Sequence, residues 1–424
     1  MGLGIDLGSS GIRLAVVDRH GELVAEASGP YPEAFANPAG WRAGLIALCH
    51  QLPQTIRSSI GAIAIDGTSG TLLLCRPNGE LATGELGLAL AYSHACPEHQ
   101  DEAGAMAGEA SPAASASGSL ARALRLLGSA QHLGLPGPWL LRHQADWLMG
   151  WLLGDWRWGE EGNNLRLGWD LQGQRWAGSI GCQAWSSALP EICPSGRRLG
   201  PIALASAEAL GLSPTCQVVA GSTDANAGVL AASPGAGDGI AVLGTTLVLK
   251  QFSPKPIQGP GISCHRVAGQ WLVGGASNGG AGILRRFFDD SQITELSRQI
   301  NPSQATGLQL RPLGAPGERF PVDDPQLQPV LEPRPISDAR YLQALLEGIT
   351  AMEVAGWAKL QALGAPPVQR VISLGGGARN PQWRALRERA LGLPVLNRPN
   401  CTAALGMAKL AARQDGPIFS ASRP

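Results

Sequence analysis

Small hydroxyl residues stand between two apolar, alternating segments near the start of the chain. The stretch Gly4–Asp18 (GIDLGSSGIRLAVVD) predicts a strand, a tight turn and a second strand, with Ser9, Ser10 and Gly11 in or beside the turn. Glycine lets backbone N–H groups point into such a turn and hydroxyls add donors, so the turn could cradle a phosphate. Asp6, just before it, could hold a Mg²⁺ ion that the phosphate also binds, usually through water. From these residues alone, an ordinary hairpin is the simpler explanation.

A second copy of this pattern lies more than half the chain away. Gly239–Lys250 (GIAVLGTTLVLK) places Gly244 and Thr245 between two apolar strands. Two such turns at the starts of two halves indicate a duplicated domain with one phosphate loop from each half. Dinucleotide fingerprints and Walker A loops are excluded, because a β-branched strand follows the first turn and no Gly-Lys-Ser/Thr occurs in the chain.

Another predicted strand ends on a carboxylate. Ile60–Asp66 reads as a buried strand, and Gly67–Gly70, which contains Ser69, follows it as a turn. In an α/β sheet, ligands gather at the carboxyl ends of strands, so Asp66 and Ser69 could meet a ligand. A plain Asp-Gly turn into the apolar strand that follows is the alternative.

Asp224 is the second carboxylate in such a position. It follows the predicted strand Cys216–Ala220 and a Gly-Ser-Thr turn, and it precedes the predicted helix Ala225–Ala232. The residue type fits a helix N-cap. The helix dipole also favours a negative charge at this position.

Glycines gather again towards the C-terminus. Gln369–Leu374 predicts a buried strand, and the three glycines that follow, Gly375 to Gly377, would let a flat base approach the backbone. Asn380 and Pro381 suit the N-cap and the first residue of the next helix.

In this order, the motifs resemble those of the FGGY carbohydrate kinases, in the actin/hexokinase-like ATPase superfamily, over nearly the whole chain. GIDLGSSGIRLAVVD and LGTTLVLK look like the two phosphate motifs, SLGGGARNPQW (373–383) like the adenosine motif and GERFPVDDP (317–325) like a signature loop. IDGTSGT (65–71) and the chain length look most like cyanobacterial and plant D-ribulose kinases. The Trp-x-Asp-x-Arg segment with which many members bind sugar hydroxyls is missing near residues 92–99. Its absence disfavours a straightforward xylulose kinase.

The resemblance implies an α/β fold of two RNase H-like (actin/hexokinase-type) domains with an ATP/sugar cleft between them. Residues 1–232 would form the sugar-binding domain and 233–424 the nucleotide-binding domain, with a last helix, 402–413, that returns to the first domain. The Gly and Pro content of 233–239 (SPGAGDG) predicts the hinge between the domains. The implied activity is ATP-dependent phosphorylation of a ketopentose, most closely D-ribulose to D-ribulose 5-phosphate. D-Xylulose or another polyol is the alternative substrate.

Site residues follow from the resemblance by position. Asp224 would be the catalytic base, and Asp6, Ser10, Gly11, Ser69 and Asp224 would bind the sugar. ATP would be held by Ser9, Ser10, Gly244, Thr245, Gly280, Gly376, Gly377, Asn380 and Trp383, and Mg²⁺ by Asp6 through water. Chaperone ATPases and filament-forming relatives are less favoured because the GERFPVDDP loop is present and no peptide-binding domain is recognisable. A sugar-binding member without catalysis is also less favoured, because Asp6 and Asp224 are both present.

Composition fits a cytoplasmic enzyme. With 424 residues, 44% of them apolar, the chain can build two domain cores, and its net charge of zero gives no reason to expect nucleic-acid or membrane-surface binding. No apolar run approaches the ~20 residues of a membrane span, and the early first strand leaves no room for a signal peptide. The eight cysteines form no Cys-x-x-Cys pair, which predicts free thiols. We expect a monomer or a homodimer.

Other patterns predict local structure. Residues 22–28 read as a third strand of the first sheet, and helices are expected over 41–57, with an irregularity at Pro53, and over 338–363. His94, Cys96 and His99 are metal-ligand types, but no partner pair accompanies them, so a substrate-side loop is favoured over a zinc site. Eight of the twelve tryptophans fall in 139–185 at irregular spacing, which indicates packing rather than sugar stacking.

Overall fold

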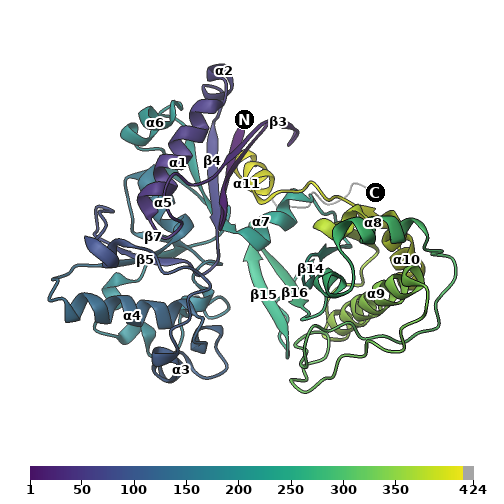
Figure 1. The fold of residues 1–424 in the computed structure, drawn as a ribbon. Coiled ribbons are helices and arrows are strands. Elements are labelled where there is room, and N and C mark those ends of the chain that lie inside the picture. Colours follow the sequence, from purple (N-terminus) through teal and green to yellow (C-terminus); the bar gives the residue numbers. More distant parts are fainter. Residues whose placement is uncertain (414–424) are drawn as a thin grey trace. The chain divides into compact units, whose positions relative to one another are not determined.

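The computed structural model describes residues 1–413, and the chain divides into two compact units (Figure 1). Of the described residues, unit 1 comprises Met1–Ala231, Arg266–Gly269 and 402–413. Unit 2 comprises Ala232–His265 and Gln270–Cys401. Each unit contains one six-stranded sheet.

The large sheet of unit 1 has the strand order β11-β12-β4-β1-β2-β3. The strands are β1 Gly2–Gly8, β2 Gly11–Val17, β3 Leu23–Gly29, β4 Ala62–Gly67, β11 Arg198–Pro201 and β12 Gln217–Thr223. The predicted hairpin is confirmed, because β1 and β2 are antiparallel and Gly8 pairs with Gly11. β3 is the predicted third antiparallel strand, and β4 runs parallel to both β1 and β12.

Further elements of unit 1 surround this sheet. The helices are α1 Pro38–Gln51, α2 Gln54–Arg57, α3 Gln100–Ala107, α4 Ser119–His132, α5 Gln144–Leu153, α6 Leu204–Leu210, α7 Asp224–Ala231 and α11 Ala403–Ala412. Three two-stranded sheets add β5 Leu72–Cys75 with β6 Leu140–His143, β7 Trp158–Glu160 with β10 Glu191–Cys193, and β8 Trp169–Asp170 with β9 Arg175–Trp176.

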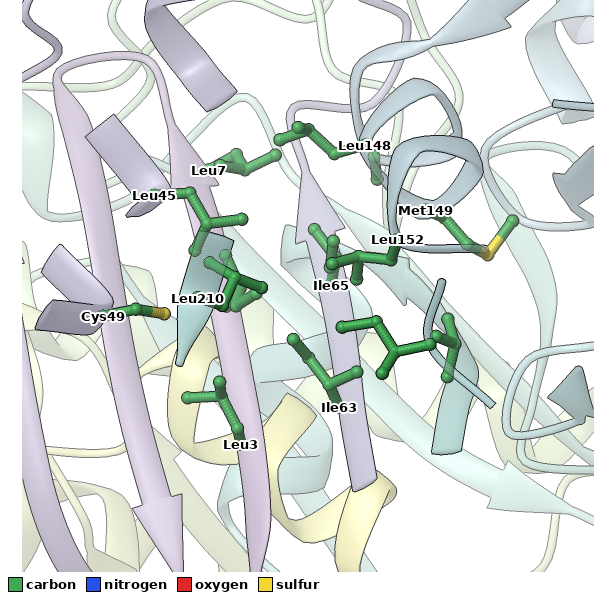
Figure 2. Close-up of a cluster of buried hydrophobic side chains, with 14 of the residues drawn as sticks. Leu3, Leu7, Leu45, Cys49, Ile63, Ile65, Leu148, Met149, Leu152 and Leu210 are labelled. Atoms are coloured by element: carbon green, nitrogen blue, oxygen red, sulfur yellow. The ribbon is translucent and has the colours of Figure 1, made fainter. Parts of the chain in front are cut away.

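One face of the large sheet carries the core of unit 1. Because side chains alternate along a strand, Leu3, Ile5 and Leu7 of β1 point to the same face, and all three are fully buried. Figure 2 shows side chains of β1 and β4 gathered with those of the covering helices: Leu45 and Cys49 of α1, Leu148, Met149 and Leu152 of α5, and Leu210 of α6. This packing fixes the position of the strand ends.

The opposite face is covered by α7 and α11 at very close range. A Cβ on Gly2 would lie 2.4 Å from the carbonyl oxygen of Ala408, and one on Gly4 would lie 2.0 Å from that of Ala404. Only glycine therefore lets α11 pack directly on β1. Asp6 shares this face with both glycines, so its carboxylate stands at the end of the strand that these two helices cover.

Unit 2 repeats this plan with the strand order β15-β16-β14-β13-β17-β18. Its strands are β13 Asp238–Leu243, β14 Leu247–Ser253, β15 Ile262–Val267, β16 Gln270–Ala276, β17 Arg370–Leu374 and β18 Val395–Asn397; its α-helices are α8 Asp290–Arg298, α9 Asp338–Ala362 and α10 Pro381–Leu391. In each sheet, three neighbouring strands are antiparallel (β1-β2-β3 and β13-β14-β16), and two strands beside the first of them run parallel to it (β4 and β12; β17 and β18). The predicted duplicated α/β fold is confirmed.

Two predicted boundaries need correction. The expected helix over 41–57 begins earlier, at Pro38, where Asn37 caps α1, and Pro53 separates it from α2. The predicted turn between residue 220 and Asp224 is wrong, because β12 continues through Thr223 and Asp224 is the first residue of α7. The strand continues because Ser222 and Thr223 still pair with β4.

The expectations for the tryptophans and for the cysteines are confirmed. The tryptophans of 139–185 pack into the hydrophobic clusters of unit 1, and the ring of Trp169 meets that of Trp176 edge-on. All eight cysteines are free thiols. Within residues 1–413, no three His, Cys, Asp or Glu side chains are arranged to hold a metal, and none of the helices there could cross a bilayer.

Candidate functional site

Three carboxylates converge in unit 1 where parallel strands end. Asp6 of β1 lies directly opposite Asp66 of β4, and Asp66 lies opposite Ser222 of β12, two residues before Asp224. Because partners in register point to the same face, the two strand carboxyls are neighbours. The carboxyl ends of parallel strands are where α/β sheets bind ligands.

Asp6 has one cation beside it. Its side chain is 6% exposed, and its Oδ2 accepts a hydrogen bond of 2.8 Å from Nη1 of Arg13, which is half exposed. A carboxylate so held keeps lone pairs for a cation or a water. Since no protein metal cluster exists in residues 1–413, a Mg²⁺ ion here would take most of its ligands from phosphate and water, as this ion usually does. The residues thus fit the expected role of Asp6.

Asp66 is fully buried, and its carboxyl oxygens accept no hydrogen bond within the described chain; its carboxyl neighbour is that of Asp6. Burial raises the pKa of Asp66 well above its usual range, and the neighbouring charges of Asp6 and Asp224 add to the effect. The folded protein therefore keeps a proton on this carboxyl that the unfolded chain loses above about pH 4.

A pH-dependent effect on stability follows. A group whose pKa is raised on folding contributes fully below its unfolded pKa, and the contribution is lost as pH rises towards the folded pKa. Asparagine carries no such proton, so Asp66→Asn should match the wild type in melting temperature near pH 4 and exceed it increasingly up to pH 8. One kcal/mol would appear as about 2–4 °C in a unit of this size.

Asp238→Asn is the matched control for Asp66→Asn. Asp238 is also buried but is paired with Arg370 through two hydrogen bonds of 2.8 and 2.7 Å. Its asparagine variant should melt below the wild type at neutral pH. Melting curves recorded across this pH range would contradict the assignment for Asp66 if the Asp66→Asn difference did not change with pH.

Asp224 begins α7 and is partly exposed, and its Oδ1 accepts a hydrogen bond of 2.7 Å from the backbone N–H of Ala225. The helix N-terminus stabilises negative charge at this position. Asp224 comes two residues after Ser222, which lies opposite Asp66, so the structure brings Asp224 to the same end of the sheet as Asp66.

Ser69 lies in the loop between β4 and β5 and is half buried. The two neighbouring hydroxyls are turned inward: Thr68 and Thr71 bond to each other at 2.6 Å, and Thr68 donates to Oε1 of Gln144 at 2.8 Å. Ser69 makes no side-chain hydrogen bond within residues 1–413, which leaves its hydroxyl available to a ligand.

The remaining residues predicted for the sugar have different surroundings. Ser10 is an exposed residue of the β1–β2 turn, like Ser9. Gly11 is buried, and a Cβ there would lie 2.5 Å from the carbonyl oxygen of Gly29 on β3. The close approach of β3 accounts for this glycine without a ligand.

Unit 2 contains a pocket of about 820 Å³, a volume typical of small-molecule sites. Its lining includes six residues predicted to hold the nucleotide: Gly244, Thr245, Gly376, Gly377, Asn380 and Trp383. Leu243, Ile293 and Leu346 give it apolar walls. Arg379 brings positive charge, as do Arg285 and Arg298, which are ion-paired with Asp290 of the lining and with Glu295. A flat apolar base with an anionic tail fits this combination.

The glycine floor of the pocket differs from position to position. Gly375 has φ +81°, where a side chain would be strained. A Cβ on Gly377 would lie 2.4 Å from the Trp383 ring and 2.7 Å from Cβ of Leu243, so this glycine is required by the protein's own packing. At Gly376, which is exposed, a Cβ would meet nothing within 4 Å.

Gly376 is therefore the position that tests the pocket without disturbing its walls. Gly376→Val should weaken ATP binding by about tenfold or more, since the side chain would occupy space over the floor, while the melting temperature stays near wild type. Gly314→Val, also in open space in unit 2 but outside the lining, is the control. If calorimetry gave equal ATP affinities for the two variants, the hypothesis that ATP binds over Gly376 would be wrong.

Gly280 is not in the lining, although Ala281 and Gly282 are. Its Cβ would lie 2.6 Å from the carbonyl oxygen of Thr245, and the N–H of Ala281 donates to the carbonyl of Gly244 at 2.9 Å. Gly280 thus supports the turn between β13 and β14 rather than facing the pocket.

Sequence reasoning missed one wall of the pocket. Ile293, Thr294, Ser297 and Arg298 of α8 line it, and Nδ2 of Asn380 donates to Oγ of Ser297 at 2.8 Å. The signal was present: Asp289 and Gln292 form a capping box that marks the start of this helix.

Part of the chain matches a known protein family, and solved structures with a similar fold are known. Residues 239–414 match the FGGY family of carbohydrate kinases, C-terminal domain. The fold is similar to xylulose kinase from Rhodospirillum rubrum (TM-score 0.80, 22% identity) and to gluconate kinase from Lactobacillus acidophilus (TM-score 0.77, 15% identity), each over 96% of this chain and 88% of the other. Plasmodium falciparum glycerol kinase with ADP is similar at TM-score 0.75 and 15% identity over the same shares. Residues 239–414 are therefore a C-terminal domain of the FGGY family of carbohydrate kinases, in a chain whose fold is that of solved carbohydrate kinases.

Proposed function

We propose that the protein is an ATP-dependent sugar kinase that transfers the γ-phosphoryl group of ATP to the terminal hydroxyl of a ketopentose, D-ribulose, giving D-ribulose 5-phosphate. The observation that carries the proposal is the glycine-floored pocket of an FGGY C-terminal domain, lined by six of the predicted nucleotide residues. The carboxylate cluster of unit 1 supplies the acceptor side of the chemistry.

Asp224 is the proposed general base. It takes the proton of the sugar hydroxyl while the hydroxyl oxygen forms a bond to the γ-phosphorus, and the bond from that phosphorus to the bridging oxygen of ADP breaks. Asp6 is the residue that would hold the nucleotide's Mg²⁺ ion, whose charge offsets that of the phosphates. No covalent intermediate with the protein is required, because phosphoryl transfer depends mainly on positioning and electrostatics.

Two features of unit 1 favour D-ribulose over D-xylulose as the substrate: the lack of charged side chains near residues 92–95 and the hydroxyl of Ser69. The segment near residues 92–95 carries no acidic residue, Lys or Arg that could bind sugar hydroxyls. The hydroxyl of Ser69, which makes no hydrogen bond within residues 1–413, could donate to a sugar hydroxyl in place of a charged side chain. D-Xylulose, L-ribulose or a polyol is the alternative, and the solved structures with this fold include xylulose, gluconate and glycerol kinases.

A substrate panel tests the proposal. ADP release is measured with D-ribulose, D-xylulose, L-ribulose, ribitol and glycerol at equal concentrations, and D-ribulose should give the highest kcat/KM. A preference for D-xylulose or glycerol would contradict the assignment of D-ribulose as the substrate but not the assignment of kinase activity. ATP consumption that no acceptor stimulates would overturn the kinase.

Ser69 should contribute to sugar selectivity. Ser69→Ala leaves one sugar hydroxyl without a partner, which costs about 1–3 kcal/mol, so kcat/KM for D-ribulose should fall about 5- to 150-fold. The fall for D-xylulose, which differs at one carbon, should be smaller. Ser58→Ala, an exposed hydroxyl deletion in the same unit, should change neither value. Equal losses on the two ketopentoses would show that Ser69 does not discriminate.

A further inference from the structure

Arg122 of α4 is a fully buried cation held only by backbone carbonyls. Its Nε donates to the carbonyl of His94 at 2.8 Å, its Nη1 to that of Gly70 at 2.9 Å, and its Nη2 to those of Ser117, at 3.0 Å, and Tyr92. No carboxylate in residues 1–413 pairs with it. One guanidinium thus joins three separate loops.

The first of these loops is the one that carries Ser69. Gly70 has φ +97°, a conformation that turns its carbonyl onto Arg122 and that other residues rarely adopt. The second loop, around Tyr92–His94, is tied to the first again, since the N–H of Tyr92 donates to Oγ1 of Thr71 at 3.1 Å. Loss of Arg122 would release both loops together.

The orientation of these carbonyls fixes the amides next to them. In a trans peptide the C=O and the following N–H point in opposite directions. Because the carbonyls of Tyr92 and His94 point at Arg122, the N–H groups of Ser93 and Ala95 point away from it. Both residues are exposed, and neither N–H has an acceptor within residues 1–413.

We propose that Arg122 is a positioning residue of the acceptor site, which holds the Ser69 loop and presents the backbone N–H groups of Ser93 and Ala95 as donors to the oxygens of an uncharged polyhydroxy substrate. Backbone amides would then do what charged side chains do in other sugar sites. The inference rests on the proposed function for the identity of the ligand, but the arrangement of the loops does not depend on it.

Arg142 provides a matched control. It is 1% exposed, also lacks a carboxylate partner in the described chain, and donates to the carbonyls of Leu141 at 2.7 Å, Ala188 at 3.0 Å, Arg157 at 3.2 Å and Trp156. None of these belongs to the Ser69 loop or the Tyr92–His94 loop. Replacement of either arginine removes a buried fork of the same kind, so the two variants differ in which loops they release.

The test compares Arg122→Lys with Arg142→Lys, which keep the charge but lose the planar fork. Arg122→Lys should raise the KM for D-ribulose about tenfold or more and change the KM for ATP less than twofold; Arg142→Lys should change neither KM. Equal effects of the two variants on the sugar KM, or none from Arg122→Lys, would overturn the proposal.

Hydrogen exchange separates this inference from the proposed function and needs no turnover. Peptides covering 67–71 and 92–96 should exchange faster in Arg122→Lys and unchanged in Arg142→Lys, even if no sugar is phosphorylated. Saturating D-ribulose should slow exchange of 92–96 in the wild type. If the loops exchange alike in both variants, Arg122 does not position them. If the sugar leaves 92–96 unprotected while turnover proceeds, the amides are not its donors.

Discussion

Replacement of Asp224 by asparagine is expected to lower kcat for sugar phosphorylation by ~10²–10⁴-fold, the usual contribution of a general base. Asparagine keeps the size of the side chain and can still accept the hydrogen bond that Oδ1 of Asp224 receives from Ala225. It cannot take the proton of the attacking hydroxyl. KM values for ATP and for the sugar should therefore change little, and the loss should appear in kcat.

Asp338→Asn is the control for a carboxylate at a helix start. Asp338 is the first residue of α9, as Asp224 is of α7, and its side chain is half exposed and paired with Arg334 at 2.7 Å. This variant should retain full activity. Near-normal turnover in Asp224→Asn, with an unchanged circular dichroism spectrum, would refute the assignment of the base.

Replacement of Arg387 by methionine should destabilise unit 2 by about 3–5 kcal/mol, the cost of breaking a buried ion pair. Arg387 of α10 is fully buried and grips Glu353 of α9 through hydrogen bonds of 2.6 and 2.8 Å, while its third nitrogen donates to Ser373 at 2.5 Å. Ser373 lies two residues before Gly375. The pair thus ties both helices to the strand that leads into the glycine floor.

The size of the effect comes from the charge that is left behind. Glu353 is 1% exposed, so without Arg387 its carboxyl would be buried with no cation to pair with. The double variant Arg387→Met/Glu353→Gln removes that charge and keeps an oxygen for the indole N–H of Trp357, which donates to Glu353 at 3.2 Å. Calorimetric melting should show the single variant about 10 °C below the wild type and the double variant well above the single one. A double variant as unstable as the single would contradict this explanation.

Local patterns were sufficient for much of the fold. Alternation and turn chemistry predicted both hairpins, and the spacing of their turns predicted the duplication, because these signals lie within a few residues of each other. The correction at 221–223 has the opposite origin. A Gly-Ser-Thr run reads as a turn, but pairing of Ser222 and Thr223 with β4 extends the strand, and that pairing joins residues far apart in the sequence.

Some residues of the candidate site could likewise be predicted from local motifs, and others could not. Gly244, Gly376 and Asn380 belong to contiguous motifs, and the structure gathers them in one pocket. The buried Asp66, whose carboxyl accepts no hydrogen bond, could not be predicted. Nor could the backbone carbonyls that bind Arg122, since both features depend on burial and on neighbours from other loops. Gly377 shows the limit of a motif: the glycine was expected to make room for a base, whereas the Trp383 ring already requires it.

Transfer of phosphate to a terminal sugar hydroxyl can be observed directly by ³¹P NMR of the reaction. Wild-type protein with ATP, Mg²⁺ and D-ribulose should convert ATP to ADP and produce a new phosphate monoester signal, split into a triplet by the two protons of the terminal CH₂ group. The same mixture with Asp224→Asn should show almost none of this signal. Appearance of inorganic phosphate in place of the triplet, or no change in the ATP signals with any sugar of the panel, would contradict the account.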